Sequence, residues 1–312
     1  MTLRTVKRLA VLGVLVLAGR AEAGGGNAGT TAANFLTQGA GGAPLGMGGA
    51  ALALGGDLAA AAWNPAALGG IGSAQLALSH AGLPDESRQE WVALGGTVRG
   101  PAWNWGLSGL FVNQGSIEGR DASNQPTGAL DASSVALGGT LTRNFGSGAA
   151  GVTARWVGDH LGPVTGSGFT FDAGLQLRRA GFGLGAAAQN VGGQMAYGST
   201  RYPFPTNYGA GLSFEDSRGI RAALDMNFPY AYYQDVRLGL EYRWKETLAL
   251  RTGYRRELGS DPASEALTGP SFGLGAGAHG LWLDYAWLPS NLGASEHRIG
   301  LTFVPERARM GQ

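Results

Sequence analysis

The chain has 312 residues, of which 56 are glycine, 14% are charged and none is cysteine, and its formal net charge is +1. Glycine without a period of three excludes collagen, and an apolar content of 44% argues against simple disorder. Without cysteine there is no disulfide framework, thiolate metal site or lipoprotein anchor, and the scattered basic residues offer no stripe for nucleic acid.

Residues 1–23 have the pattern of a cleaved secretory signal peptide. Three basic residues among the first eight precede an apolar run at 9–18, and Ala21-Glu22-Ala23 follows as a small-residue cleavage site. That apolar run is too short for a transmembrane helix, which needs about 20 residues. We therefore expect an exported protein that begins near Gly24 and has no helical membrane anchor.

Residues 24–72 are predicted to form an N-terminal hatch, or plug. The stretch 35–68 is too apolar and too rich in glycine for a solvated tail, yet too interrupted to span a membrane. Asp57 can cap a short helix that runs to Trp63, and Asn64-Pro65 can cap a second helical turn that runs through Leu68. We expect two short helices joined at an elbow, with Trp63 buried against an enclosing wall. The predicted hatch and gating residues are Gly46, Gly48, Gly49, Asp57, Trp63, Asn64 and Pro65.

Residues 73–304 contain segments of about ten residues with period-two alternation, which is typical of tilted membrane-spanning strands. In the segment 234–243, Asp235, Arg237 and Glu241 lie on one face and apolar residues on the other. The fourteen predicted strands are 73–80, 90–99, 103–112, 134–143, 148–157, 168–178, 181–190, 206–214, 219–227, 234–243, 246–255, 270–277, 280–287 and 296–303. The polar residues expected to face the lumen are Asp172, Asp225, Arg237, Glu241, Arg251, Asp284 and Arg298.

A soluble β-sandwich also alternates, so the connections must decide between the two folds. Connections after the even-numbered strands are tight, whereas those after odd-numbered strands are longer, notably 113–133, 158–167, 191–205 and 256–269. Aromatic residues near segment ends, including Trp91, Trp103 and Trp244, are typical of interfacial girdles. We predict an all-β fold: a 14-stranded antiparallel transmembrane β-barrel of the outer membrane, with a luminal hatch and a short tail at 305–312.

The motifs resemble those of a known family. The run from Gly46 to Leu68, with Gly-Met-Gly-Gly-Ala, then Asp57, then Trp63-Asn64-Pro65-Ala66, resembles the opening signature of the PorV/PorQ family, which is similar to the FadL-type outer-membrane transport barrels. Further matches lie at 171–175, 189–192, 224–227, 239–242, 250–254, 283–286 and 296–299. The resemblance implies a fourteen-stranded barrel with an N-terminal hatch. One departure is that the chain continues past Phe303, where barrels of the family usually end on an aromatic residue.

No motif predicts catalysis or a cofactor. Ser271 lies in a Gly-x-Ser-x-Gly match, but the match opens a strand after a loop, whereas a nucleophile elbow joins a strand to a helix. The four histidines are isolated and lack metal-ligand spacing. The inward carboxylates have many arginines with which to pair, so structural ion pairs are favoured over acid-base chemistry. We expect no enzyme activity, no cofactor and no metal.

Two functions are consistent with these features. From the family resemblance, the chain would be an accessory component of type IX-like protein secretion or surface cargo handling, with secreted proteins or other secretion components as partners at loops 113–133 and 256–269. From the FadL likeness, it would be a passive channel for hydrophobic small molecules that is gated by the hatch. Both place the protein in contact with outer-membrane lipid.

Overall fold

The computed structural model describes residues 27, 29–83, 87–98, 102–245, 247–259, 268–289 and 295–305, except for the side chains of 116 and 117. The predicted signal peptide at 1–23 and the tail beyond 305 lie outside the described residues. No helix in the described part of the chain has the length and apolarity needed to cross a membrane.

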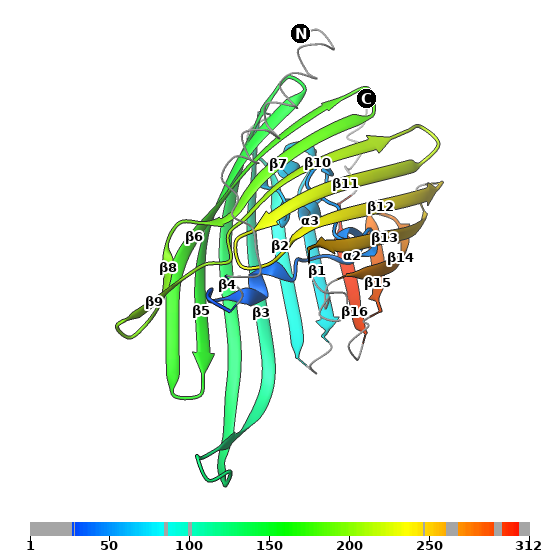
Figure 1. The fold of residues 1–312 in the computed structure, drawn as a ribbon. Coiled ribbons are helices and arrows are strands. Elements are labelled where there is room, and N and C mark those ends of the chain that lie inside the picture. The colour runs from blue at the N-terminus through cyan, green and yellow to red at the C-terminus, as the bar shows by residue number, and fades with distance from the viewer. Residues whose placement is uncertain are drawn as a thin grey trace.

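Fourteen antiparallel strands close into a barrel, as predicted (Figure 1). The barrel closes because the first strand, β1, pairs with the last, β16, while β5 pairs with β6 and β7 pairs with β10. The wall strands are β1 (Gln75–Gly82), β2 (Arg88–Val98), β3 (Trp103–Arg120), β4 (Pro126–Phe145), β5 (Gly148–Leu161), β6 (Val164–Arg179), β7 (Phe182–Val191), β10 (Asn207–Glu215), β11 (Ile220–Pro229), β12 (Gln234–Trp244), β13 (Leu248–Leu258), β14 (Gly269–Ala278), β15 (Leu281–Leu288) and β16 (Glu296–Phe303).

The alternation of the sequence becomes an apolar outer face and a polar or small-residue inner face. In β1 the exposed positions are Leu76, Leu78 and, at the far end, His80, and the buried ones include Ala77 and Ser79. Trp91 is an exception to the predicted girdle. It is one of the alternate residues of β2 that point into the barrel, between Gln89 and Ala93, and it is buried. An aromatic residue near a strand end therefore faces lipid only when it is one of the alternate residues that point outward.

The two rims of the barrel differ. On one rim the turns are tight, and in Ala180-Gly181 and His279-Gly280 both residues have positive φ, as a two-residue type I′ hairpin requires. On the other rim the strands run further than predicted.

The segment 113–133, predicted as a loop, is mostly hairpin, because β3 continues to Arg120 and β4 starts at Pro126. Similarly, β5 and β6 extend into 158–167, and 191–205 contains the hairpin of β8 (Gln194–Tyr197) and β9 (Thr200–Pro203). In the predicted loop 256–269, β13 extends to Leu258 and β14 begins at Gly269, while 260–267 lie outside the described residues. The prediction ended each strand where the apolar pattern ended, yet backbone pairing continues where both faces are polar.

The N-terminal segment, residues 29–72, carries four short helical turns: η2 (Asn34–Thr37), α2 (Gly42–Gly46), α3 (Leu58–Ala61) and η3 (Pro65–Gly70). As predicted, Asp57 caps α3, since its Oδ1 accepts the Ala60 N–H at 2.7 Å. Asn64 is extended and caps η3, with Pro65 at the first position. These two turns form the predicted elbow, whereas η2 and α2 had no recognised signal.

This segment lies inside the barrel and forms its core (Figure 1). Leu45, Met47 and Trp63 belong to one buried cluster, and Leu58 and Leu68 pack with Trp91 of the wall in a second. The apolar residues of 35–68 are therefore enclosed by the strands.

Candidate functional site in the barrel interior

Glycines on the inner wall let the backbone of the N-terminal segment lie directly against the strands. A Cβ on Gly185 would come within 2.0 Å of the Leu52 carbonyl oxygen, and one on Gly253 within 2.1 Å of the Gly48 nitrogen. A Cβ on Gly174 would lie 1.9 Å from Asn64 Oδ1. Because no side chain separates the two, wall side chains nearby can reach the backbone of the segment.

Those side chains bind the backbone of the segment at many points. Asp225 Oδ2 of β11 accepts the N–H groups of Ala51 and Leu52 at 2.7 and 2.8 Å. The further wall residues that donate to segment carbonyls are Gln75, Gln89, Asn104, Thr142, Gln176, Gln189, Ser213, Arg237, Ser271 and Arg298. A buried backbone needs such partners, and here the barrel supplies them.

Ser271, the central residue of the Gly-x-Ser-x-Gly match, is one of these contacts. Its hydroxyl accepts the N–H of Gly48 at 2.8 Å and donates to the carbonyl of Gly46 at 3.2 Å. Gly48 has φ of +69° and Gly49 has φ of +74°, a conformation that glycine adopts without strain. The serine therefore fixes a tight turn after α2, and no described histidine bonds to it.

Asn64 joins the elbow to the wall. Its Oδ1 accepts the Ala66 N–H at 3.0 Å, and its amide donates to Leu52 O at 2.7 Å and to Leu175 O of β6 at 3.2 Å. The side chain is fully buried. The amide also lies 3.4 Å from Ala186 O of β7, so the capping residue of η3 cross-links two parts of the segment and two strands of the barrel.

Trp63 is buried, as expected. Its indole N–H donates to the Ala40 carbonyl at 3.1 Å, a group within the segment, and not to the wall. The wall instead contacts the ring face, because the Arg237 guanidinium lies 5.4 Å from the ring centroid. Arg237 also donates to Gly49 O at 3.4 Å, so one arginine contacts two separate parts of the segment.

The predicted luminal charges form ion pairs on the inner wall. Arg251 joins Glu241 at 2.6 Å and Asp284 at 2.7 Å. Arg221 and Arg243 also contact Glu241, both at 3.3 Å, making a network beside the tight-turn rim. A charge network of this kind fills the lumen near one rim without leaving a buried carboxylate unpaired.

The remaining predicted luminal residues lie nearer the other rim. Asp235 pairs with Arg237 at 2.6 Å and with Arg255 at 2.9 Å, and Arg298 pairs with Glu296 at 2.7 Å. Asp172 pairs with Arg155 at 2.7 Å and accepts the Asn190 N–H at 2.7 Å, at an irregularity in the pairing of β6 and β7. Among the described residues, no three side chains of metal-binding type come together.

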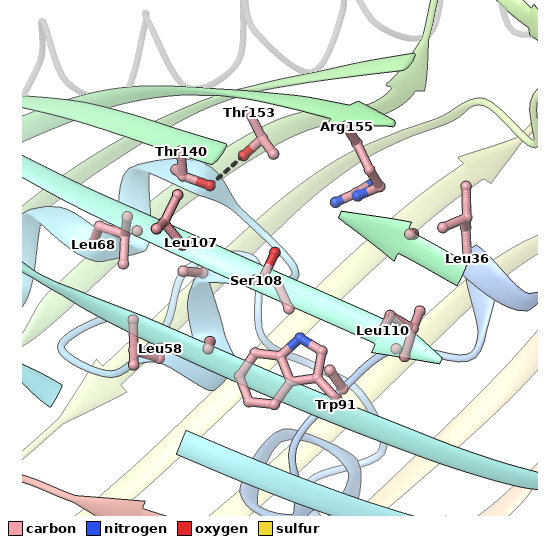
Figure 2. A pocket seen from close by; sticks show the side chains of 17 residues that line it. Leu36, Leu58, Leu68, Trp91, Leu107, Ser108, Leu110, Thr140, Thr153 and Arg155 are labelled. Atoms are coloured by element: carbon pink, nitrogen blue, oxygen red, sulfur yellow. Dashed lines mark hydrogen bonds between the residues drawn. The ribbon is translucent and has the colours of Figure 1, made fainter. Parts of the chain in front are cut away.

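A small cavity lies between the segment and strands β2 to β5, and its volume is about 60 Å³ (Figure 2). Most of its lining is apolar, from Leu36, Leu58, Leu68 and Leu110. The polar groups at its boundary are Trp91, Ser108, Thr140, Thr153 and Arg155, and Thr140 and Thr153 bond to each other at 2.8 Å. An apolar pocket with a few polar groups is the usual form of a small-molecule site.

Sequence reasoning missed Trp91 and Ser108. The available signal was strand parity, since the polar residue Gln89 and the small residue Ala93 fix Trp91 on the inward face of β2.

The hairpin β8–β9 covers the interior on the long-strand side. Met195 and Phe204 pack in a buried cluster with Phe35 of the segment and Val157 of β5. The Tyr197 hydroxyl donates to Asp159 of β5. Burial, together with this hydrogen bond, raises the pKa of the Tyr197 phenol above its ordinary value.

No protein-family model and no curated protein matches the chain. Solved structures do match the fold. The Ralstonia pickettii toluene transporter TbuX has a TM-score of 0.62 at 15% identity, over 87% of this chain and 100% of that one. The P. putida toluene transporter TodX has a TM-score of 0.58 at 13% identity, over 86% and 99%. A deltaS2 mutant of the TodX monoaromatic hydrocarbon channel has a TM-score of 0.54 at 13% identity, over 84% and 97%. At these identities the likeness shows a shared fold.

Proposed function

We propose that this barrel is an outer-membrane channel of FadL type for the passive entry of hydrophobic small molecules. The observation that carries the proposal is the apolar cavity enclosed between the wall and its own N-terminal segment. The apolar outer face and the shared fold with two toluene transporters support it. The neighbours are transporters, and the interior residues described above act as structural contacts, which agrees with a non-enzymatic role.

The N-terminal segment acts in this proposal as a gate. A cavity of about 60 Å³ is smaller than the roughly 150 Å³ apolar cavity that admits benzene. An aromatic hydrocarbon therefore enters only when the segment, the hairpin β8–β9 or both move. The elbow at Asn64-Pro65 and the turn at Gly48-Gly49 are the positions where the segment changes direction, and they are the proposed gating residues.

The test is uptake of radiolabelled cumene by a Gram-negative host that lacks hydrocarbon channels of its own. Cells that carry the protein should take up cumene faster than cells with an empty vector. A disulfide between the segment and the wall, introduced at Ala53 and Ser213, should stop uptake until it is reduced, because Ser213 already contacts Ala53 O at 3.0 Å. Equal uptake by vector and wild-type cells would refute the channel.

The secretion function rests on the sequence motifs alone, at the N-terminus and along the wall. It remains a second proposal whose partners would be secreted proteins or secretion components, and no contact in the described residues favours it over transport. Of its two predicted contact loops, 113–133 is a paired hairpin with a short turn at 121–125. A deletion strain with an unchanged set of surface and secreted proteins would exclude it.

A further inference from the structure

Trp91 has a hydrogen-bond donor that the protein leaves unused. The side chain is 6% exposed and lines the cavity, and its indole N–H meets no acceptor among the residues that the structure describes. The contrast with Trp63 is direct, since that equally buried indole donates to Ala40 O. The indole N–H opens onto the cavity, so a water molecule or a ligand atom in the cavity can be its acceptor.

A second unused polar group lies beside it. Ser108 of β3 also lines the cavity, and its hydroxyl has no partner in the described part of the chain. Trp91 pairs with Leu110 and Ala93 pairs with Ser108 across β2 and β3, so Trp91 and Ser108 are diagonal neighbours on the inward face. Figure 2 shows the indole nitrogen on the side of the Trp91 ring that faces Ser108. The two groups therefore border the same cavity.

The rest of the lining is of a different kind. Leu36, Leu58 and Leu68 surround the remaining space. The other polar groups of the lining each have a partner within the protein, since Thr140 and Thr153 bond to each other and Arg155 holds Asp172 and Asn190. Trp91 and Ser108 are thus the polar residues of the lining whose side chains have no partner among the described residues.

We infer that the preferred ligands of this channel are apolar molecules that carry one hydrogen-bond-accepting oxygen, such as aryl ketones, with that oxygen bound by Trp91 Nε1–H and the Ser108 hydroxyl. The inference rests on the proposed transport function and specifies its substrate class. The cavity can also hold water, which a ligand oxygen would displace while keeping the hydrogen bond. A plain hydrocarbon would displace the water without replacing that bond, and it binds less well for that reason.

Acetophenone and cumene test this, because they have the same number of heavy atoms and differ in the carbonyl oxygen. The readout is the ratio of acetophenone uptake to cumene uptake, corrected for the vector. Trp91→Phe keeps an aromatic side chain, though a smaller one, and removes the N–H, so the ratio should fall by about three- to tenfold, the effect of one neutral hydrogen bond. Trp287→Phe is the matched control, since Trp287 is exposed on the outer face and stacks on Phe272, and its ratio should stay at the wild-type value.

A second measurement does not depend on transport. In a spectrum of protein labelled with ¹⁵N-indole, the Trp91 N–H signal, assigned by its loss in Trp91→Phe, should move on adding acetophenone and move less with cumene. Should Trp91→Phe fail to fold, as judged by loss of heat-modifiability, Ser108→Ala replaces it in the uptake assay.

An unchanged ratio together with an unmoved indole signal would overturn the inference, while cumene uptake above the vector level would still support the channel. If neither compound enters faster than in vector cells, the channel itself is refuted, and the indole signal alone then decides whether the donor site binds the ketone.

Discussion

Replacing Asp225 with alanine should free the middle of the N-terminal segment from the wall. The carboxylate is fully buried and holds two backbone N–H groups through one oxygen. A hydrogen bond contributes about 0.5–1.5 kcal/mol, or about 1.5–3 kcal/mol when one partner is charged, so the two together contribute about 1–6 kcal/mol. Every 1.4 kcal/mol is a factor of ten, which gives an increase of roughly 5- to 10⁴-fold in the local opening of residues 49–54.

Native-state hydrogen exchange measures this opening directly, because protection of an amide reports the free energy of the local unfolding that exposes it. Amides of Ala51 and Leu52 should lose protection by that factor, while those of β11 should change little. Asp225→Asn should have a smaller effect, since its amide oxygen can still accept both N–H groups but carries no charge.

Asp216→Ala is the matched control for this experiment. Asp216 Oδ1 also accepts two backbone N–H groups, from Arg218 and Ile220, both at 3.0 Å, but in the exposed turn between β10 and β11. Its removal should leave protection of 49–54 unchanged. If Asp225→Ala matches this control, the segment is held by its other contacts, and the reasoning from the carboxylate is refuted.

Three further predictions follow from the same contacts. Pro65→Ala and Trp63→Ala should leave the barrel heat-modifiable but increase protease access to 39–56. The first variant frees the φ angle of the elbow, and the second creates a cavity that costs about 3–5 kcal/mol of stability. Wild-type protection in both variants would contradict a gate at the elbow. Gly174→Ala should displace Asn64, since the new Cβ would lie 1.9 Å from the Asn64 Oδ1, and it should raise small-solute leakage. Gly72→Ala should not raise leakage, because the Cβ added there would meet no atom within 4 Å. The pKa of Tyr197 is raised in the folded state, so its contribution to docking of β8–β9 is complete below pH 10, the pKa of the unfolded phenol, and falls as the pH rises above 10. Alkaline release of the hairpin, measured by proteolysis at 192–206, should therefore be absent in Tyr197→Phe. Release at the same pH in both proteins would contradict this.

The barrel and its elbow could be predicted from local signals. Alternation at 234–243 fixed which residues face inward, and Asp57 and Asn64-Pro65 are capping signals that act within a few residues. Strand length on the long-strand side could not be predicted in this way, because β3 and β4 continue as a ladder beyond the apolar band, where pairing depends on backbone hydrogen bonds.

The contacts between segment and wall were beyond reach for another reason. Gln176 and Ser213 contact residues more than 120 positions away, and no local pattern distinguishes them from other inward polar residues. Trp91 could have been found from parity, but its free N–H could not, since that depends on what the folded segment leaves beside it.

The pairing of the first strand with the last has a consequence for biogenesis. The last turn of the N-terminal segment, η3, ends at Gly70, and β1 begins at Gln75, so residues 71–74 join the segment to the strand that closes the barrel. The end of the segment therefore lies beside the β1–β16 seam whenever that pair forms. The same segment also contacts glycines and polar side chains of β6, β7, β11 and β14. Docking of the segment and closure of the barrel are coupled for this reason.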